Sequence, residues 1–171
     1  MNVLKRIRKY IILGVVNTIF RGTHFFTIKR YLLNMCPGVQ LGYNVKIVTP
    51  IYIPALSGMY IQENTWIGRN FSIEGNGEVL IGGNCDLGPS VTCITGSHKI
   101  GDTNRRAGEG YNSNISIGRG CWIGAKASLL PGISVAEGCV IGAATNVTRD
   151  TEPNGVYVGN PAMKVRDLEG E

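Results

Sequence analysis

Aliphatic residues recur at every sixth position in the second half of the chain. The file consists of Ile117, Ile123, Leu129, Val135, Ile141 and Val147. A spacing of six suits neither an α-helix, which turns once in about 3.6 residues, nor a single strand, whose side chains alternate with period two. The pattern therefore predicts an internal repeat in which each unit is one short strand and one corner.

A second file of mostly small residues accompanies the aliphatic one. Four positions after each aliphatic residue stand Cys121, Ala127, Ile133, Cys139, Thr145 and Thr151, of which only Ile133 is large. Glycine often follows the aliphatic residue directly, where it relaxes the backbone at a tight corner. A coil of stacked units of this kind would bury one continuous column that no unit could bury alone.

The same rhythm is present upstream, with changes of phase. It reads Val39, Val45 and Ile51, then Ile61, Ile67 and Ile73, then Ile81, Leu87 and Cys93. Prolines and glycines mark the first change of phase, and residues 74–77 mark the second. Between Thr95 and Asn114 the pattern fails, because the inward positions would be Lys99, Arg105 and Tyr111. We expect a loop at 95–114 that leaves the coil, and long excursions of this kind are often functional.

Residues 1–35 lie outside the repeat, and we expect them to form one or two helices. The uncharged run from Tyr10 to Phe20 has eleven residues, whereas about 20 are needed to span a bilayer. Arg21 follows this run without a small-residue cleavage site, so a secretion signal is not indicated. We expect a helical cap over the open end of the coil, and contact with a membrane surface is an open alternative. The expected division is a cap at 1–35, a coil domain at 36–166 and a tail at 167–171.

Composition favours one domain in a reducing compartment. The chain has 171 residues, 24 of them Gly, and only 17% are charged. The chain has five cysteines, and no two of them form a CxxC motif. Most of them fall on inward positions of the repeat. We therefore expect reduced core cysteines and a cytoplasmic protein.

The net charge of +5 is concentrated at the amino end. The first 62 residues hold eight Lys and Arg and no Asp or Glu, while the remainder holds nine basic and twelve acidic residues. No nucleic-acid-binding module accompanies this charge, so we expect no nucleic-acid partner. Basic residues beside an apolar helix suit the anionic inner face of a membrane better.

His98 is the strongest chemical candidate. It stands in the segment ITGSHKIGDTNRR and is the one His outside the amino-terminal segment, which holds His24. An imidazole can accept a proton near neutral pH. With two His in the chain and the cysteines turned inward, no three-ligand set with metal spacing can be assembled, so we expect no metal.

Several motifs resemble one known family. The aliphatic file, CWIGAKASLLPG, VIGAATNVTRD and the near-terminal GNPA are similar to the hexapeptide-repeat acyltransferases over about residues 39–166. The resemblance implies an all-β solenoid, a left-handed parallel β-helix, here with a short amino-terminal helical segment and one long extruded loop. VTCITGSH is similar to the segment with the catalytic His of the galactoside, maltose and related sugar O-acetyltransferases. IKRYLLNMCPGVQLGYNVKI resembles the lead-in of members that acetylate bacterial surface polysaccharides.

The resemblance also implies a mechanism and a co-substrate. His98 would be the general base in direct transfer from acetyl-CoA, and the backbone N–H of Ala125 would stabilise the oxyanion. Pantetheine would lie along the last coils, past Ala125 and Ala143. The phosphates would meet basic residues, namely Arg149, Lys164 and Arg166. This chain departs from the family at Met163, since a basic residue more often follows GNPA directly.

The acceptor-binding candidates have two origins. Glu74 and Asn76 occupy positions similar to those that contact sugar in the related enzymes, whereas Asp102, Arg105 and Arg106 are loop residues whose side chains can bind hydroxyls or an anionic sugar. Trp66 and Trp122 each precede an aliphatic residue of the file and therefore face outward, where we expect another subunit to cover them. The family forms homotrimers, so the sites would lie between subunits.

The sequence supports three functional hypotheses. The first is an acetyl-CoA-dependent O-acetyltransferase that modifies a sugar hydroxyl of a surface-glycan precursor. The second keeps the fold but acetylates an amino-sugar nucleotide or serine. The third is a β-helix without catalysis, such as a scaffold, or a metal-dependent type that the shortage of His disfavours.

Overall fold

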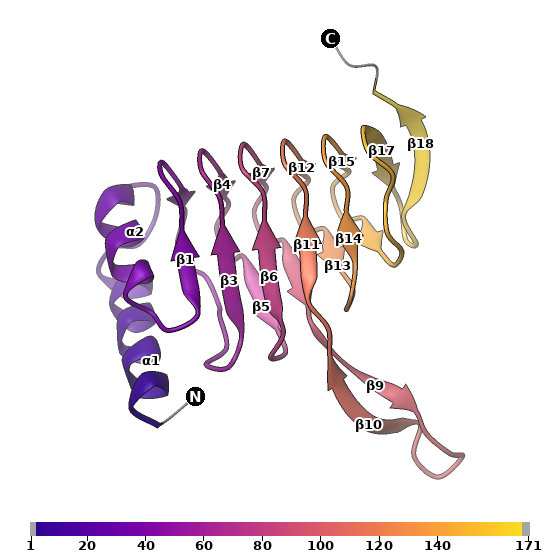
Figure 1. The fold of residues 1–171 in the computed structure, drawn as a ribbon, viewed down its shortest axis with the longest axis horizontal. Coiled ribbons are helices and arrows are strands. Elements are labelled where there is room, and N and C mark those ends of the chain that lie inside the picture. Colours follow the sequence, from indigo (N-terminus) through magenta and orange to yellow (C-terminus); the bar gives the residue numbers. More distant parts are fainter. Residues whose placement is uncertain (1–2, 169–171) are drawn as a thin grey trace.

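The chain winds into a triangular coil of short strands with two helices over its amino-terminal end (Figure 1). The structure is a computed structural model that describes residues 3–168. The helices are α1 (Val3–Thr18) and α2 (Phe26–Asn34). One sheet contains β1 (Val39–Leu41), β3 (Gly58–Ile61), β6 (Glu78–Ile81), β11 (Ile115–Ile117) and β14 (Ser134–Val135).

The other two walls of the coil are built in the same way. The second sheet contains β2 (Lys46–Ile47), β4 (Trp66–Ile67), β7 (Asp86–Leu87), β12 (Trp122–Ile123), β15 (Val140–Ile141), β17 (Gly155–Val158) and β18 (Met163–Asp167). The third contains β5 (Ser72–Glu74), β8 (Thr92–Ile94), β13 (Ser128–Leu129) and β16 (Asn146–Val147). From β3 to β16, apart from the excursion of β9 and β10, the chain visits the three sheets in turn, so each of these coils contributes one strand to each wall. The first coil contributes only β1 and β2, and β17 and β18 both extend the second sheet.

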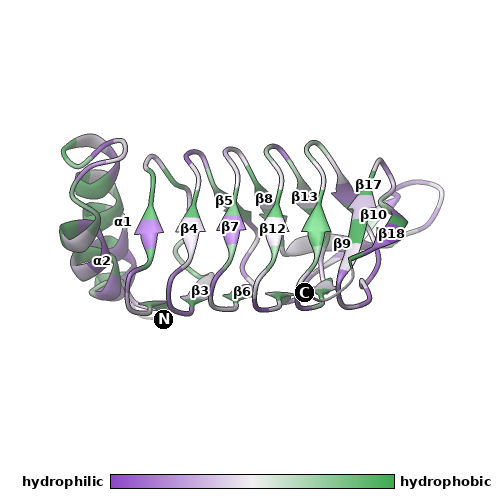
Figure 2. Cartoon of the chain, turned by 90° about the horizontal axis from the view of Figure 1, so that it is seen from above, coloured by the Kyte–Doolittle hydropathy of each residue, from purple (hydrophilic) through white to green (hydrophobic). Residues whose placement is uncertain are grey.

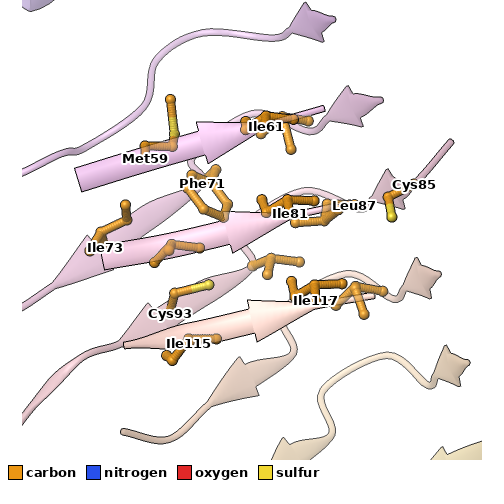
Figure 3. Packing of buried hydrophobic residues seen from close by; sticks show 14 of the residues in the cluster. Met59, Ile61, Phe71, Ile73, Ile81, Cys85, Leu87, Cys93, Ile115 and Ile117 are labelled. Carbon is orange, nitrogen blue, oxygen red and sulfur yellow. The ribbon is translucent and has the colours of Figure 1, made fainter. Parts of the chain in front are cut away.

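Aliphatic side chains stack in register inside the coil (Figure 3). In the second sheet Ile67 pairs with Leu87, Leu87 with Ile123 and Ile123 with Ile141, all through parallel strands. These residues are buried, as are their counterparts in the other two sheets. The predicted six-residue repeat is therefore confirmed, and the column it buries is the hydrophobic core of the protein.

The first coil has a different phase from the one that the sequence pattern indicated. Val39 and Val45 were expected to stand in the aliphatic file, but Leu41 is the residue in register with Ile61, and Ile47 with Ile67. The misreading arises because the first coil has pairs of buried aliphatic residues two positions apart, Val39 with Leu41 and Val45 with Ile47, so two phases fit equally well.

Small inward residues close the corners of the coil. The thiols of Cys85, Cys121 and Cys139 donate to the carbonyl oxygens of Gly118, Ala136 and Glu152, each on the following coil, at 3.0–3.1 Å. All five cysteines are free and buried, as the pattern predicted. Burial raises the pKa of Cys93 to about 12, which makes that thiol chemically inert near neutral pH.

The two helices pack on the open end of the coil and are held there by buried polar groups. The ammonium of Lys9 donates to the carbonyl of Ser57 at 2.7 Å, and that of Lys29 donates to the carbonyl of Ile47 at 2.6 Å. Asn17 forms a two-way hydrogen bond with the backbone of Ile51. Burial lowers the pKa of both lysines to about 8. Within residues 3–168 no helix is both long and apolar enough to cross a bilayer.

The segment at 95–114 leaves the coil as expected, but it is a regular β-hairpin and not the irregular loop that the sequence indicated. β9 (Gly96–Ile100) and β10 (Ala107–Asn112) pair antiparallel and project away from the coil (Figure 1). The inward file is interrupted here because the hairpin side chains face solvent on both sides, so no apolar periodicity is needed.

Candidate active site

The hairpin is fastened to the coil by backbone and amide hydrogen bonds. The N–H of Thr95 donates to the carbonyl of Glu74 at 2.7 Å. On the other strand, the side-chain oxygen of Asn112 accepts from the N–H of Asn76 at 2.7 Å, and that of Asn114 accepts from Glu78 at 2.8 Å. The corner at 74–77 therefore lies directly against the base of the hairpin.

A close backbone approach makes this junction specific to glycine. Gly75 has φ +110°, and a side chain on it would collide with the backbone of Gly96 at the start of β9. The buried hydroxyl of Thr95 donates to the carbonyl of Glu74 and accepts from the N–H of Gly77, both at 3.1 Å. The direction in which the hairpin leaves the coil is thus fixed by its first residues.

His98 lies in the middle of β9 with its side chain exposed. It pairs across the hairpin with Gly110, where an added Cβ would stand 3.7 Å from the ring. Among residues 3–168 no group forms a hydrogen bond with the imidazole, so both ring nitrogens can interact with a substrate. The absence of a side chain at Gly110 leaves room on that side of the ring.

Ala125 and Ala143 occupy one corner of the coil in consecutive turns. The N–H groups on either side of Ala125 are bonded within the coil, that of Gly124 to the carbonyl of Ile141 and that of Lys126 to the carbonyl of Pro89. In the described part of the chain the N–H groups of Ala125 and Ala143 have no acceptor. Two unpaired donors beside small side chains fit a ligand that carries carbonyl oxygens, such as a thioester or a pantetheine amide.

The predicted base and the predicted oxyanion donor lie on different edges of one wall. Ala125 stands between β12 and β13, where the chain enters the third sheet, whereas the hairpin with His98 follows β8, where the chain leaves that sheet. A single chain therefore does not bring the two groups together.

The three predicted phosphate-binding residues differ in their surroundings. Lys164 forms ion pairs with Asp167 at 2.5 Å and with Glu152 at 2.7 Å, which raise the pKa of its ammonium. Arg149 follows β16 and Arg166 lies on β18, and both side chains are exposed. Neither arginine has an ion-pair partner among the described residues. The arginines are therefore better placed than Lys164 to attract an anion.

The predicted acceptor-binding residues fall into two groups. Glu74 and Asn76 are exposed at the base of the hairpin, while Asp102 and Arg105 lie at its tip. One carboxylate oxygen of Asp102 accepts from the N–H groups of Asn104 and Arg105 at 2.9 and 3.1 Å, so this residue also stabilises the turn.

Some features of the site region were not anticipated from the sequence. Asn112 and Asn114, which anchor the hairpin, were not singled out, although the run YNSN just before the pattern resumes was a usable signal. A groove of about 790 Å³ over the first sheet, lined in part by Tyr60 and Arg119, was not foreseen either. This groove contains none of the predicted site residues.

The two tryptophans do face outward, but they have different neighbours. Trp66 contacts the ring of Phe26 on α2, with ring centroids 5.4 Å apart, and is half-buried. Trp122 is 61% exposed on the same face two coils further on. The helical cap of the same chain therefore covers part of Trp66, whereas Trp122 is exposed. Within residues 3–168 no group of three or more His, Cys, Asp or Glu side chains is arranged to hold a metal.

Comparisons with known proteins agree with this architecture. Residues 114–149 match the family model for the bacterial transferase hexapeptide (six repeats). The chain is 33% identical to the galactoside O-acetyltransferase of Escherichia coli over 75% of this chain, but only 63% of that protein is spanned. It is 33% identical to the putative acetyltransferase YJL218W of Saccharomyces cerevisiae, over 81% of this chain and 68% of the relative.

Two further similarities concern glycan biosynthesis and coenzyme A. The putative colanic acid biosynthesis acetyltransferase WcaF of Escherichia coli is 28% identical over 81% of this chain and 74% of its own length. A solved structure of galactoside acetyltransferase in complex with coenzyme A superposes with a TM-score of 0.81 at 26% identity, over 97% of this chain and 82% of that one.

The molecule is thus a left-handed parallel β-helix of the acetyltransferase type, as the motifs implied. The chain belongs to the hexapeptide-repeat acetyltransferase family.

Proposed function

We propose that the protein is an acetyl-CoA-dependent O-acetyltransferase that acts on a sugar hydroxyl of a surface-glycan precursor. Membership of an acetyltransferase family supports the reaction, and the relatives named for galactosides and for colanic acid support the acceptor class. The observation that carries the proposal is the placement of His98, an exposed imidazole on a hairpin that is anchored to a rigid coil. Such a group can meet a substrate without first breaking an internal hydrogen bond.

The proposed chemistry is a direct acyl transfer. His98 accepts the proton of the sugar hydroxyl while the oxygen attacks the thioester carbonyl, and the N–H of Ala125 donates to the carbonyl oxygen as it gains negative charge. The C–S bond then breaks, and the imidazolium returns the proton to the departing thiolate. No covalent bond to the protein is formed at any stage.

The proposed site lies between subunits of a homotrimer. His98 and the N–H of Ala125 are on opposite edges of one wall in each chain, so the hairpin of one subunit would meet the corner of its neighbour. Trp122, three residues before Ala125, supports the same contact between subunits. Its indole is exposed to solvent on the surface of a sheet, and exposed apolar surface of this kind often marks a protein–protein interface.

The co-substrate would bind along the carboxy-terminal coils. The unpaired N–H groups of Ala125 and Ala143 suit the carbonyl groups of acetyl-pantetheine, and Arg149 and Arg166 suit the phosphates. Lys164 would attract the phosphates less strongly, because the carboxylates of Glu152 and Asp167 offset its positive charge. No metal is required for this mechanism.

The acceptor would bind along the hairpin. Glu74 and Asn76 at its base and Asp102 and Arg105 at its tip offer hydrogen-bonding groups for several hydroxyls. The location that suits such a substrate is the cytoplasm, where acetyl-CoA is made available to biosynthetic enzymes.

Release of free thiol from acetyl-CoA tests the proposed function. The acceptors should be a panel of neutral sugars, amino sugars, amino-sugar nucleotides and serine. Release with a sugar that lacks an amino group supports O-acetylation. Release only with an amine or with serine identifies a different acceptor class. No release with any acceptor, together with no binding of coenzyme A, would contradict the proposal and favour a scaffold.

The oxyanion role of Ala125 has a test that the coil itself suggests. Pro89 occupies the equivalent corner position one coil earlier, because Leu87 and Ile123 are in register. Ala125→Pro should therefore keep the fold while it removes the N–H. We expect turnover to fall by about 10²–10³-fold with unchanged thermal stability. Unchanged turnover would remove Ala125 from the mechanism.

A further inference from the structure

Exposed apolar side chains are concentrated on the helical cap. In the described part of the chain 20 large apolar residues are exposed, and ten of them precede residue 36. They are Val3, Leu4, Ile7, Tyr10, Ile11, Ile19, Phe25, Ile28, Tyr31 and Met35. A cap that served only to cover the coil would need one apolar face, so a second apolar face requires its own explanation.

Helix α1 is apolar on its outward side as well as on the side that packs against the coil. The charged residue Lys9 is fully buried against the coil, together with Leu13 and Val16. Ile7 and Ile11 lie one turn apart, and the helical period places them on the opposite side, where both are exposed. The outward side of α1 is therefore apolar although it faces solvent.

Helix α2 repeats this arrangement. Lys29 and Leu33 are buried toward the coil, while Ile28, Tyr31 and Met35 form an exposed stripe with the spacing of one helix face. Both helices lie over the same end of the coil (Figures 1 and 2). We call the outward stripes of the two helices the cap face: Val3, Leu4, Ile7, Tyr10, Ile11, Ile28, Tyr31 and Met35.

The charges around the cap face have one sign. Arg6 and Arg8 are exposed, and as chain neighbours of Ile7 they project about 100° to either side of it. The first acidic residue of the sequence is Glu63, which belongs to the coil and not to either helix. A second copy of this face would bring like charges together, whereas an anionic partner would neutralise them.

We propose that the cap face binds the surface of an anionic lipid bilayer. Helix α1 has 16 residues, so at about 1.5 Å per residue it is shorter than the hydrocarbon core, and it would lie along the surface rather than across it. Ile7 and Ile11 would enter the boundary between headgroups and acyl chains, and Arg6 and Arg8 would meet the phosphates. This inference does not depend on the acetyl-transfer reaction.

The orientation has a consequence for the candidate active site. With the cap face on the membrane, the coil axis stands roughly upright, because the helices cover its end (Figure 1). The hairpin leaves the coil just before β11, three strand spacings from β1 in the first sheet. At about 4.8 Å per spacing, plus about 10 Å for a helix, the base of the hairpin that carries His98 would stand roughly 25 Å above the lipid. A membrane-attached glycan could reach that height.

Vesicle flotation with the full chain tests the proposal. The vesicles should be phosphatidylcholine alone, or phosphatidylcholine with about 30% phosphatidylglycerol, at roughly physiological salt. The wild-type protein should float with the anionic vesicles only. Ile7→Ser with Ile11→Ser should lower the partition coefficient at least tenfold. Arg6→Gln with Arg8→Gln should lower it about thirtyfold, and this second loss should shrink as salt rises.

Matched controls lie outside the cap. Val165→Ser removes an exposed aliphatic from β18, and Arg69→Gln removes an exposed charge from a corner of the coil. Both should leave flotation unchanged, and all four variants should keep the melting temperature of the wild type, since the side chains are exposed. Failure of the wild type to float with anionic vesicles overturns the proposal. A loss of self-association in Ile7→Ser with Ile11→Ser, without a loss of flotation, would assign the face to a second copy instead.

Discussion

The regular coils from Ile115 to Val147 and the hairpin from Gly96 to Asn112 follow different rules of construction. In the coils every strand is parallel and in register with the next, and each inward residue is buried. The hairpin is antiparallel, and most of its side chains face solvent. The coil therefore supplies stability and position, while the hairpin supplies the exposed groups that can meet a substrate. The stability of one region and the chemistry of the other should respond to different substitutions.

His98→Ala should have the largest effect on turnover and almost none on stability. If His98 is the general base, turnover should fall by about 10²–10⁴-fold with the affinity for coenzyme A nearly unchanged. His24→Ala is the matched control, because it removes the other His, which is also exposed. Steady-state kinetics and calorimetric titration measure the two quantities. Equal turnover of both variants would show that the hairpin does not carry the base.

The same Ile→Ala change should separate the two regions by stability. Ile123 is fully buried in the coil, so its truncation should lower the free energy of unfolding by about 2–5 kcal/mol. Ile100 is 89% exposed on the hairpin, and its truncation should change that free energy by less than about 0.5 kcal/mol. Denaturant unfolding measures both. A large loss at Ile100 would mean that the hairpin packs against something in solution.

Thr95→Val tests the junction between the two regions. The buried hydroxyl joins the corner at Glu74 to the base of the hairpin, and its loss leaves the N–H of Gly77 unpaired. We expect a cost of about 1–3 kcal/mol and a fall in turnover, because the hairpin loses its anchor. Thr92→Val removes an outward hydroxyl on β8 whose one side-chain hydrogen bond among residues 3–168 is with Ser72, so it should cost less and leave turnover unchanged. Equal losses of stability and turnover in the two variants would show that Thr95 is not a specific anchor of the hairpin.

The ion pair on the hairpin should contribute least. Lys99 and Glu109 lie 2.7 Å apart, but their side chains are 65% and 73% exposed. In a double-mutant cycle of Lys99→Gln and Glu109→Gln the coupling energy should be below about 0.5 kcal/mol, since water screens exposed charges. A larger coupling would mean that the hairpin is stabilised by its own surface contacts rather than by its base.

Much of the coil was predictable because its physics is periodic. Aliphatic residues at every sixth position, such as Ile123, Leu129 and Val135, predict a coil of short strands with these side chains inside. The structure shows this coil. The phase of the first coil was not predictable, since Val39 and Leu41 are both apolar and both buried. The burial of Lys9 could not be predicted for a different reason. Its ammonium is buried because it donates to the carbonyl of Ser57, which lies 48 residues further along the chain.

The candidate active site was harder to predict than the fold from the physical chemistry of the sequence alone. His98 was selected because it interrupts the repeat, but its role and that of Ala125 rest on resemblance to a family. The pairing of Lys164 with Glu152 could not be foreseen, since it requires β17 and β18 to fold back on each other. A site that two chains share, as proposed here, would leave no pattern in the spacing of one chain.

Mixed oligomers test the central claim most directly, namely that the coil of one chain and the hairpin of its neighbour share a site. Chains with His98→Ala and chains with Ala125→Pro should each be nearly inactive alone. Co-expressed in equal amounts, they should recover about a quarter of the wild-type turnover, because one site in four would combine an intact His98 with an intact Ala125 from adjacent subunits. No recovery in mixtures that are verified to contain both chains would contradict the account.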